Sequence, residues 1–152
     1  MKVKEIMSKD VSRVQPEDNA KDALAVLFKM QISGLPVIDK EEKLVGMFTE
    51  KEVLKQILPS YLDKVGRFVY EENPKSIGKK FQDLINMSVS QIMRREVISI
   101  DAEATLCEVA RIMLTQKIRR IPVLDQEKKV MGIVSREDVI RAYAREAGWG
   151  ID

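Results

Sequence analysis

The chain has 152 residues, of which 45% are hydrophobic and 33% are charged, a composition typical of a globular protein and not of a disordered one. Its 26 basic and 24 acidic residues give a formal net charge of +2, and this near-balance disfavours a general binder of nucleic acids or membrane surfaces. There is no histidine, which removes the commonest general base and excludes a His-based hydrolase triad. No apolar run approaches the roughly 20 residues that span a bilayer. Because Met1–Asp10 alternates charged and apolar residues, it is not a signal peptide, and we expect a cytoplasmic protein.

The sequence repeats itself at a constant offset of 86 residues, starting with Val3 and Val89. The two copies align without a gap. Gly46 aligns with Gly132, and the apolar and turn positions also coincide. Unrelated segments would not align over a whole copy without a gap, so we infer an internal duplication.

The first copy predicts five elements in chain order. A short strand at Val11–Val14 precedes a helix whose apolar residues recur at helical spacing from Ala20 to Met30. Strands at Leu35–Ile38 and Leu44–Phe48 follow, and a second helix extends from Thr49 to about Leu58.

The second copy predicts the same order. Its elements are a strand at Val97–Ile100, a helix at Leu106–Lys117, strands at Ile121–Leu124 and Val130–Val134, and a helix at Ser135–Ala144. Each copy is therefore a βαββα unit, and the fold class is α/β in the broad α+β sense. A unit of about fifty residues has a thin core. We therefore expect the two units to pack sheet to sheet as a pseudo-two-fold pair.

Residues 59–88 separate the two copies. Tyr61–Tyr70 is too apolar for a free linker, and Lys79–Met87 has the apolar spacing of a helix, so we expect an ordered, largely helical insert. The predicted organisation is repeat 1 at 1–58, the insert at 59–88 and repeat 2 at 89–152, forming one integrated module. Cys107, the only cysteine, is predicted to be a small buried hydrophobic residue.

Two segments of each copy carry a family resemblance. Residues 32–39 (ISGLPVID) and 45–52 (VGMFTEKE) resemble a cystathionine-β-synthase-type (CBS) domain. Residues 118–125 (IRRIPVLD) and 131–138 (MGIVSRED) do so as well. The resemblance implies a free-standing CBS pair, a non-catalytic regulatory module that binds an adenine nucleotide or S-adenosylmethionine between its units. It also implies a homodimer and a regulated partner protein, which the sequence does not identify.

Site residues follow from the resemblance by alignment, and each site is expected to use both units. The nucleotide site consists of Asp138, Ser135, Ile133, Arg120, Arg119, Arg136, Met7, Ser12, Ile32 and Ser33. A second, weaker site consists of Glu52, Thr49, Met47, Met93, Ile98 and Ile118. No catalytic residue, metal ligand or required cofactor is predicted.

The Thr/Ser-x-x-acid element has two interpretations. Thr49 and Glu52 match a capping box, in which each side chain bonds the backbone amide of the other, and helix initiation alone explains them. Asp138 is shorter than the Glu or Gln that the capping box prefers. We therefore interpret Asp138 as the acceptor for a ribose diol, as in dinucleotide-binding folds, and Ser135 as a helix N-terminal contact for phosphate.

The basic residues break the symmetry between the copies. Arg119 and Arg120 stand where the first copy has Ser33 and Gly34, and a guanidinium suits phosphate better than most side chains. A solvated basic turn is the alternative explanation. We expect two unequal sites and a phosphorylated ligand (AMP, ADP or ATP), since S-adenosylmethionine carries a cationic sulfonium.

Other functions stay open at this point. The chain could be a structural or scaffolding CBS pair with degenerate sites, or an S-adenosylmethionine sensor. Nucleic-acid binding through Lys79-Lys80, Arg94-Arg95 and Arg119-Arg120 is disfavoured by the balanced charge and the few aromatic residues. We expect no enzyme activity, because the chain lacks a Gly-rich phosphate loop and a nucleophile–base pair.

Overall fold

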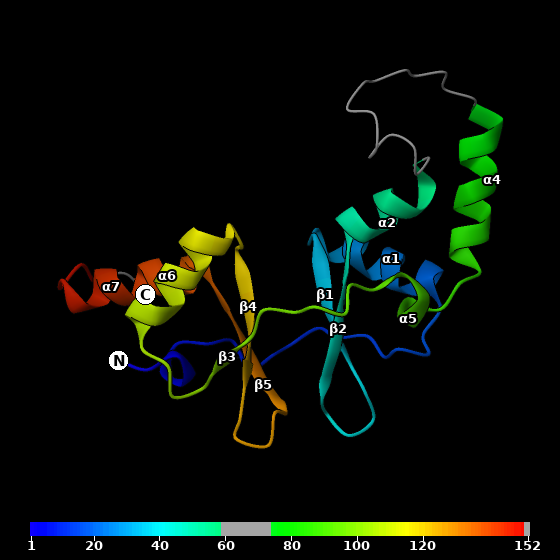
Figure 1. Cartoon of the computed structure of the whole chain (residues 1–152). Helices are drawn as coiled ribbons and strands as arrows, with labels where there is room; N and C mark the ends of the chain where they lie inside the picture. The colour runs from blue at the N-terminus through cyan, green and yellow to red at the C-terminus, as the bar shows by residue number, and fades with distance from the viewer. Residues whose placement is uncertain (59–73, 151–152) are drawn as a thin grey trace. The chain divides into compact units, whose positions relative to one another are not determined.

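A computed structural model describes residues 1–58 and 74–150 (Figure 1). The chain divides into two compact units. Unit 1 contains Met1–Ser12, Glu41–Leu44 and the chain from Ile98 onward, and unit 2 contains Arg13–Lys40 and the described part of Val45–Val97. Each unit thus contains the core of one repeat together with the opening segment of the other repeat.

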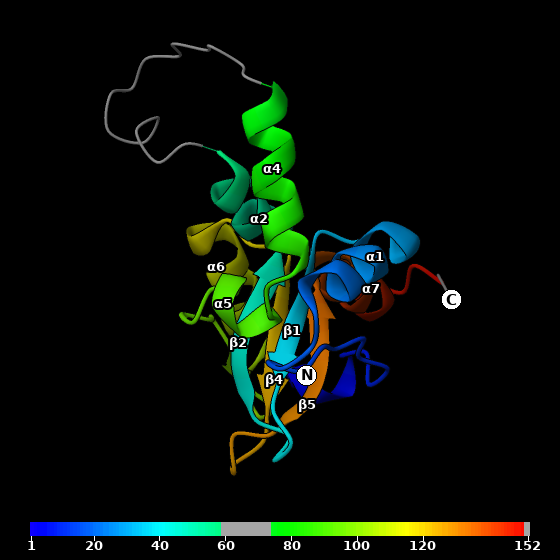
Figure 2. The same ribbon diagram turned by 90° about the vertical axis from the view of Figure 1, so that its right-hand side faces the viewer.

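Unit 2 is built on the first repeat. Its elements are α1 (Ala20–Met30), β1 (Gly34–Ile38), β2 (Leu44–Thr49), α2 (Glu50–Ile57), α4 (Pro74–Ile85) and α5 (Val89–Ile92). Strands β1 and β2 form a two-stranded sheet, and α4 packs against α2 and α1, as Figure 2 shows for α2. Its core includes Leu27, Leu35, Val37, Phe48 and Leu84.

Unit 1 is built on the second repeat. Its elements are η1 (Val3–Glu5), β3 (Ile100–Asp101), α6 (Leu106–Gln116), β4 (Arg120–Leu124), β5 (Val130–Ser135) and α7 (Arg136–Glu146). The three strands are ordered β3-β4-β5, with β3 parallel and β5 antiparallel to β4. Val3 is fully buried in the core of this unit, among residues of the second repeat such as Val109 and Ile121.

The mixed helix-and-strand class and the order of elements are as predicted, with differences at the ends. The strand expected at Val11–Val14 is reduced to a parallel bridge between Val14 and Val37. Helix α4 begins at Pro74, ahead of the predicted Lys79, because proline suits the first turn of a helix, where an amide proton has no partner. The apolar residues noted at Tyr61–Tyr70 lie outside the described residues.

Cys107 is exposed, so the prediction that it is buried is wrong. The positions of α6 that face the core are Leu106, Val109 and Met113, and Cys107 stands one residue away from that stripe. A residue displaced by one position on a helix points about 100° away, which places the thiol on the outer face.

The two repeats also share unusual backbone conformations at equivalent positions. The non-glycine residues with positive φ in the described chain form two pairs at the offset of 86. Gln31 (φ 55°) and Lys117 (φ 54°) end α1 and α6 in the left-handed conformation, and Glu42 and Lys128 (both φ 65°) lie in the turns after β1 and β4. Glycine is the usual residue at such a helix end, so both helices end on a strained residue.

Close approach to a glycine positions each opening segment. Ser8 and Ile133 exchange two backbone hydrogen bonds, of 2.8 and 2.9 Å, which place Met7 and Ser8 directly on Gly132. Met47 and Arg94 do the same in unit 2, at 2.9 Å in both directions, beside Gly46. Ile6-Met7 recurs as Ile92-Met93 at the offset of 86, as Gly46 recurs as Gly132, and both recurrences therefore reflect one packing arrangement that is present in each unit.

The N-terminal segment is also held by charge. Lys2 forms an ion pair with Glu103, and Lys4 Nζ lies 2.5 Å from the other carboxylate oxygen of Glu103. Hydrogen bonds from Lys2 and then Lys4 lower the pKa of Glu103 to about 2. Within residues 1–58 and 74–150, no helix has the length and apolar character needed to cross a membrane.

Candidate functional site

Ser135 and Asp138 begin α7 with a complete capping box. Ser135 Oγ accepts a hydrogen bond from the Asp138 amide at 3.1 Å, and Asp138 Oδ2 accepts one from the Ser135 amide at 2.8 Å. Aspartate, although shorter than the glutamate or glutamine that the capping box prefers, closes the box here. Asp138 is half-buried, and only its Oδ2 is used among the described residues, so Oδ1 can accept a hydrogen bond from a ligand hydroxyl.

Thr49 and Glu52 begin α2 differently. Thr49 Oγ1 accepts from the Glu52 amide at 3.2 Å, but the Glu52 carboxylate does not return to the Thr49 amide, so the predicted box is only half formed. Glu52 is 8% exposed, and its Oε1 is buried with no hydrogen-bond partner in the described chain. Its Oε2 lies 3.9 Å from Lys55 Nζ.

A buried carboxylate oxygen without a donor is costly, by about 1–3 kcal/mol or more. Such groups are uncommon in native proteins and call for a specific explanation. Helix initiation does not explain Glu52, whereas a hydroxyl or amide donor from a ligand would satisfy Oε1. Helix capping therefore accounts for the position of the Asp138 carboxylate but not for that of the Glu52 carboxylate.

Unit 1 brings together most residues of the Asp138 site. Arg120 lies directly opposite Ser135 in the β4–β5 pairing, and the Arg136 amide donates to the Arg119 carbonyl at 3.0 Å. Met7 lies on Gly132, next to Ile133. The residues that unit 1 contributes are Met7, Ser12, Arg119, Arg120, Ile133, Ser135, Arg136 and Asp138. Ile32 and Ser33, which were expected to complete the site, belong to unit 2.

The guanidinium groups of this site are exposed and can bind a ligand. Arg119, Arg120 and Arg136 are exposed, and none of them forms an ion pair or side-chain hydrogen bond within residues 1–58 and 74–150. The side chain of Arg136 lines a groove between α6 and α7. Arg119 and Arg120 therefore remain the stronger candidates for a phosphate contact.

Unit 2 has the same backbone arrangement, but Ser33 and Gly34 stand at the positions of Arg119 and Arg120. The Glu50 amide donates to the Ser33 carbonyl at 2.9 Å, which matches the Arg136–Arg119 bond of unit 1. The residues of the second predicted site that unit 2 contains are Met47, Thr49, Glu52 and Met93, while Ile98 and Ile118 belong to unit 1. That each site is completed by the other unit stays a prediction.

Sequence reasoning left Arg94 out of the candidate sites. Its backbone pairs with Met47, and its side chain is exposed, which places a cation beside the second predicted site. The signal was present in the alignment of the repeats, since Arg94 falls on Ser8, the residue that pairs with Ile133.

Comparison with known proteins identifies the class. The family model described as CBS domain matches residues 3–59 and 89–145, two matches at the same offset of 86 that the sequence repeat shows. The chain belongs to the CBS domain family, and the predicted pair of CBS repeats is confirmed.

Several relatives cover nearly the whole chain. An uncharacterised protein of Methanocaldococcus jannaschii is 31% identical, over 93% of this chain and 90% of its own length. The chloroplastic CBS domain-containing protein CBSX1 of Arabidopsis thaliana is 32% identical, over 92% of this chain and 63% of its own. The inosine-5'-monophosphate dehydrogenase of Methanocaldococcus jannaschii is 28% identical over 92% of this chain, which spans only 23% of that enzyme.

Solved structures show the same fold. CBSX2 in complex with AMP has a TM-score of 0.73 and 27% sequence identity, covering 96% of this chain and 98% of that one. A second structure of CBSX2, from Arabidopsis thaliana, has a TM-score of 0.76 and 26% identity, covering 97% and 96%. A solved CBS pair of this family therefore carries AMP.

Proposed function

We propose that the chain is a non-catalytic regulatory module that binds an adenine nucleotide (AMP, ADP or ATP) and thereby changes its conformation or its contact with a partner protein. The observation that carries the proposal is the backbone arrangement at the start of α7. Arg120 lies opposite Ser135 in the β4–β5 pairing, the Arg119 carbonyl accepts from the Arg136 amide, and Asp138 caps the same helix start with one carboxylate oxygen unused among the described residues. The AMP-bound CBSX2 structure supports the choice of an adenine nucleotide.

Each group has a chemical task in this proposal. Asp138 Oδ1 accepts a hydrogen bond from a ribose hydroxyl, while Oδ2 keeps its capping bond to the Ser135 amide. Arg119 and Arg120 bind phosphate oxygens with planar, charge-assisted hydrogen bonds, and Arg136 is the third candidate. Ile133 and Ile32 provide the apolar contact for adenine, with Met7, Ser12 and Ser33 at its edge, as ligand pockets commonly combine apolar walls with few polar groups.

The second site is proposed at Glu52, with Thr49, Met47, Met93, Ile98 and Ile118 around it. The unpartnered Oε1 supports a ligand hydroxyl there. Ser33 and Gly34 stand where unit 1 has two arginines, so this site is expected to favour a ligand with fewer phosphate charges. The two sites therefore differ in the ligand that they prefer.

A scaffolding CBS pair is the second candidate function. The complete capping box of Ser135 and Asp138 supports it, because helix initiation accounts for both side chains without a ligand. An S-adenosylmethionine sensor is disfavoured, since a sulfonium would lie near two or three guanidinium groups. The proposal also includes a homodimer, a cytoplasmic location and a regulated protein that co-purification from the native host would identify.

Thermal unfolding with separate additions of AMP, ADP, ATP and S-adenosylmethionine tests the proposal. A ligand at 100 times its dissociation constant adds about 2.7 kcal/mol to the stability of the folded state. We expect at least one adenine nucleotide to raise the melting temperature. If none of the four does so at millimolar concentration, the nucleotide-binding function is wrong and the scaffolding function is favoured.

A further inference from the structure

In unit 1, the two segments that flank strand β5 place their side chains on the same face of the sheet. Ile133 of β5 pairs with Ser8 on one side. Two residues further along β5, Ser135 pairs with Arg120 on the other side. Directly opposed residues have their side chains on the same face, and so do residues two apart on a strand. Ser8, Ser135 and Arg120 therefore share one face of this sheet.

In unit 2, strand β2 has the position that β5 has in unit 1. Met47 of β2 exchanges two hydrogen bonds of 2.9 Å with Arg94. On the other side of β2, Gly34 lies against Thr49, because a Cβ on Gly34 would be 2.9 Å from the Thr49 methyl group. Phe48, the residue between Met47 and Thr49, is fully buried in the core. Alternation along the strand therefore places Thr49 and Arg94 on the face opposite to the core.

The arginine on this face stands on opposite sides of the central strand in the two units. At the offset of 86, Ser8 of unit 1 is equivalent to Arg94, and Arg120 is equivalent to Gly34. Unit 1 therefore has a small residue on the opening segment and an arginine on β4. Unit 2 has the arginine on the opening segment and glycine on β1. Each unit keeps one arginine on this face.

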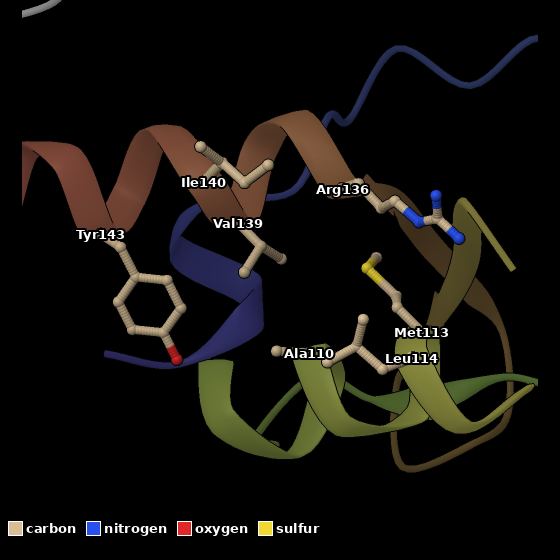
Figure 3. A pocket seen from close by; sticks show the side chains of 7 residues that line it. All are labelled: Ala110, Met113, Leu114, Arg136, Val139, Ile140 and Tyr143. Carbon is tan, nitrogen blue, oxygen red and sulfur yellow. The ribbon is translucent and has the colours of Figure 1, made fainter. Parts of the chain in front are cut away.

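The other arginines of the unit 1 site have no basic equivalent in unit 2. Arg119 aligns with Ser33, and Arg136, whose side chain lines an apolar groove between α6 and α7 (Figure 3), aligns with Glu50. Arg94 is exposed and forms no ion pair or side-chain hydrogen bond within residues 1–58 and 74–150. At these equivalent positions, unit 2 therefore offers a phosphate a single guanidinium group.

The unpartnered carboxylate oxygen of Glu52 lies on the adjoining helix start. Glu52 is 8% exposed, and its Oε1 has no hydrogen-bond partner in the described chain. It stands in the first turn of α2, which begins directly after β2, so only one strand pairing and one helical turn separate it from Arg94. A ligand that satisfies both groups presents a hydroxyl donor to the carboxylate and an anion to the guanidinium. A nucleoside monophosphate has both, in its ribose hydroxyls and its phosphate.

We propose that Arg94 binds the phosphate of a nucleoside monophosphate at the Glu52 site. The inference rests on the proposed function and adds the cation, the number of phosphates and the side of the central strand on which the phosphate lies. A guanidinium group donates two parallel hydrogen bonds to one phosphate, which suits a single phosphate group. Because one cation neutralises less charge than several, AMP should bind at this site at least as tightly as ADP or ATP.

Calorimetric titration with AMP and with adenosine isolates the phosphate contact. The background carries Asp138→Asn and Arg120→Gln, which weaken the unit 1 site so that the titration reports on unit 2. In this background, Arg94→Gln should weaken AMP binding about tenfold or more, because a charge-assisted contact is lost. It should leave adenosine binding unchanged, because adenosine has no phosphate. Arg94→Lys keeps the charge without the planar fork and should weaken AMP binding less than Arg94→Gln.

Arg95→Gln is the matched control. Arg95 is also exposed and is adjacent in the chain, but its guanidinium group donates to the Ser90 carbonyl at 3.4 Å. This variant should bind AMP as the background does. Melting of each variant without ligand checks that the fold is kept.

The outcomes separate this inference from the proposed function. If Arg94→Gln and Arg95→Gln bind AMP alike, or if Arg94→Gln weakens AMP and adenosine equally, Arg94 does not bind phosphate and only this inference is wrong. The same holds if the background binds no AMP although the wild type does. An ATP affinity tenfold above that of AMP in the background would overturn the assignment of a single phosphate. If no adenine nucleotide binds the wild type, both the inference and the proposed function fail.

Discussion

The sulfur of Met7 occupies the space that a side chain on Gly132 would need. A Cβ built on Gly132 would lie 2.8 Å from Met7 Sδ and 2.6 Å from the carbonyl oxygen of Ser8. The carbonyl is held by its bond to the Ile133 amide at 2.9 Å and cannot easily move. Glycine at this position is therefore a condition for docking the N-terminal segment on unit 1.

Gly132→Ala is expected to destabilise the protein by about 1–3 kcal/mol, the usual cost of overpacking. Gly46→Ala should cost less, because its closest contact, at 2.6 Å, is the flexible Met93 sulfur, and the nearest backbone atom, the Arg94 carbonyl oxygen, lies at 2.9 Å instead of 2.6 Å. Gly78→Ala is the matched control: a Cβ there meets nothing within 4 Å, and alanine should stabilise the interior of α4 by up to about 1 kcal/mol. Denaturant unfolding measures all three, and equal effects of Gly132→Ala and Gly78→Ala would contradict the packing argument.

Lys117→Gly is expected to stabilise unit 1, by about 1 kcal/mol at most, because glycine adopts the left-handed conformation without steric cost. Gln116→Gly is the control one residue earlier, still within α6, where glycine should destabilise. The comparison uses chemical denaturation of both variants. Opposite signs are expected, and a loss of stability in Lys117→Gly would show that this helix end is not strained.

The Glu103 ion pairs predict an acid-dependent loss of stability. Its pKa is lowered from 4.5 to about 2 by Lys2 and Lys4, so the ionised form is favoured in the folded state. The stabilising contribution is therefore present above pH 4.5 and is lost as the pH falls toward 2. Glu103→Gln should flatten the stability profile over this interval, and Glu127→Gln should not. Because the group is exposed, added salt should reduce the difference between wild type and Glu103→Gln.

Asp138→Asn separates ligand binding from helix capping. An asparagine keeps an oxygen that can accept from the Ser135 amide, so unfolding without ligand should change little. The charged acceptor for the ribose hydroxyl is lost, which should weaken nucleotide binding by about tenfold or more, since hydrogen bonds to charged groups contribute about 1.5–3 kcal/mol. Titration calorimetry with the best ligand from the melting experiments measures the effect. Unchanged affinity would assign Asp138 to capping alone.

Glu52→Met tests the buried carboxylate of unit 2. An apolar side chain of similar length removes the unpartnered Oε1, so the protein without ligand should become more stable, by about 1–3 kcal/mol. Any nucleotide-induced stabilisation that depends on Glu52 should disappear in the same variant. Glu50→Met, at an exposed position of the same helix, is the control for replacing a charge. A destabilised Glu52→Met would mean that the carboxylate has a structural partner.

Sequence periodicity predicted the helices and strands because each apolar stripe is a local property. Ala23, Leu24 and Leu27 recur at helical spacing, and the structure buries all three. Alignment in register shows that Met7 and Met93 are equivalent but not which glycine each one contacts. Their grouping with Ile133 and Met47 came from the family resemblance and not from the periodicity, and the structure places Met7 on Gly132 and Met93 on Gly46. The prediction that Cys107 is buried was wrong for a related reason. Apolar neighbours in the sequence do not determine which face of a helix a residue occupies.

The capping residues show where sequence reasoning about a site fails. Capping boxes contain glutamate more often than aspartate, and this statistical preference led us to predict the box at Thr49 and Glu52. The structure has the complete box at Ser135 and Asp138, whereas the buried Glu52 carboxylate does not accept from the Thr49 amide. The arginine asymmetry, in contrast, was visible in the sequence, since it depends on residue identity alone.

The placement of Val3 makes the two repeats inseparable by a single cut. Cutting the chain between the repeats would separate Val3 from the core of the second repeat, in which it is buried. The first repeat would then carry an apolar N-terminal segment with no core to pack against. The other half would lose the segment that pairs with Ile133 and covers Gly132. Either half could regain a complete unit only by taking up an opening segment from another molecule. The fused, duplicated chain supplies that segment in cis, so completing each unit does not require a second molecule.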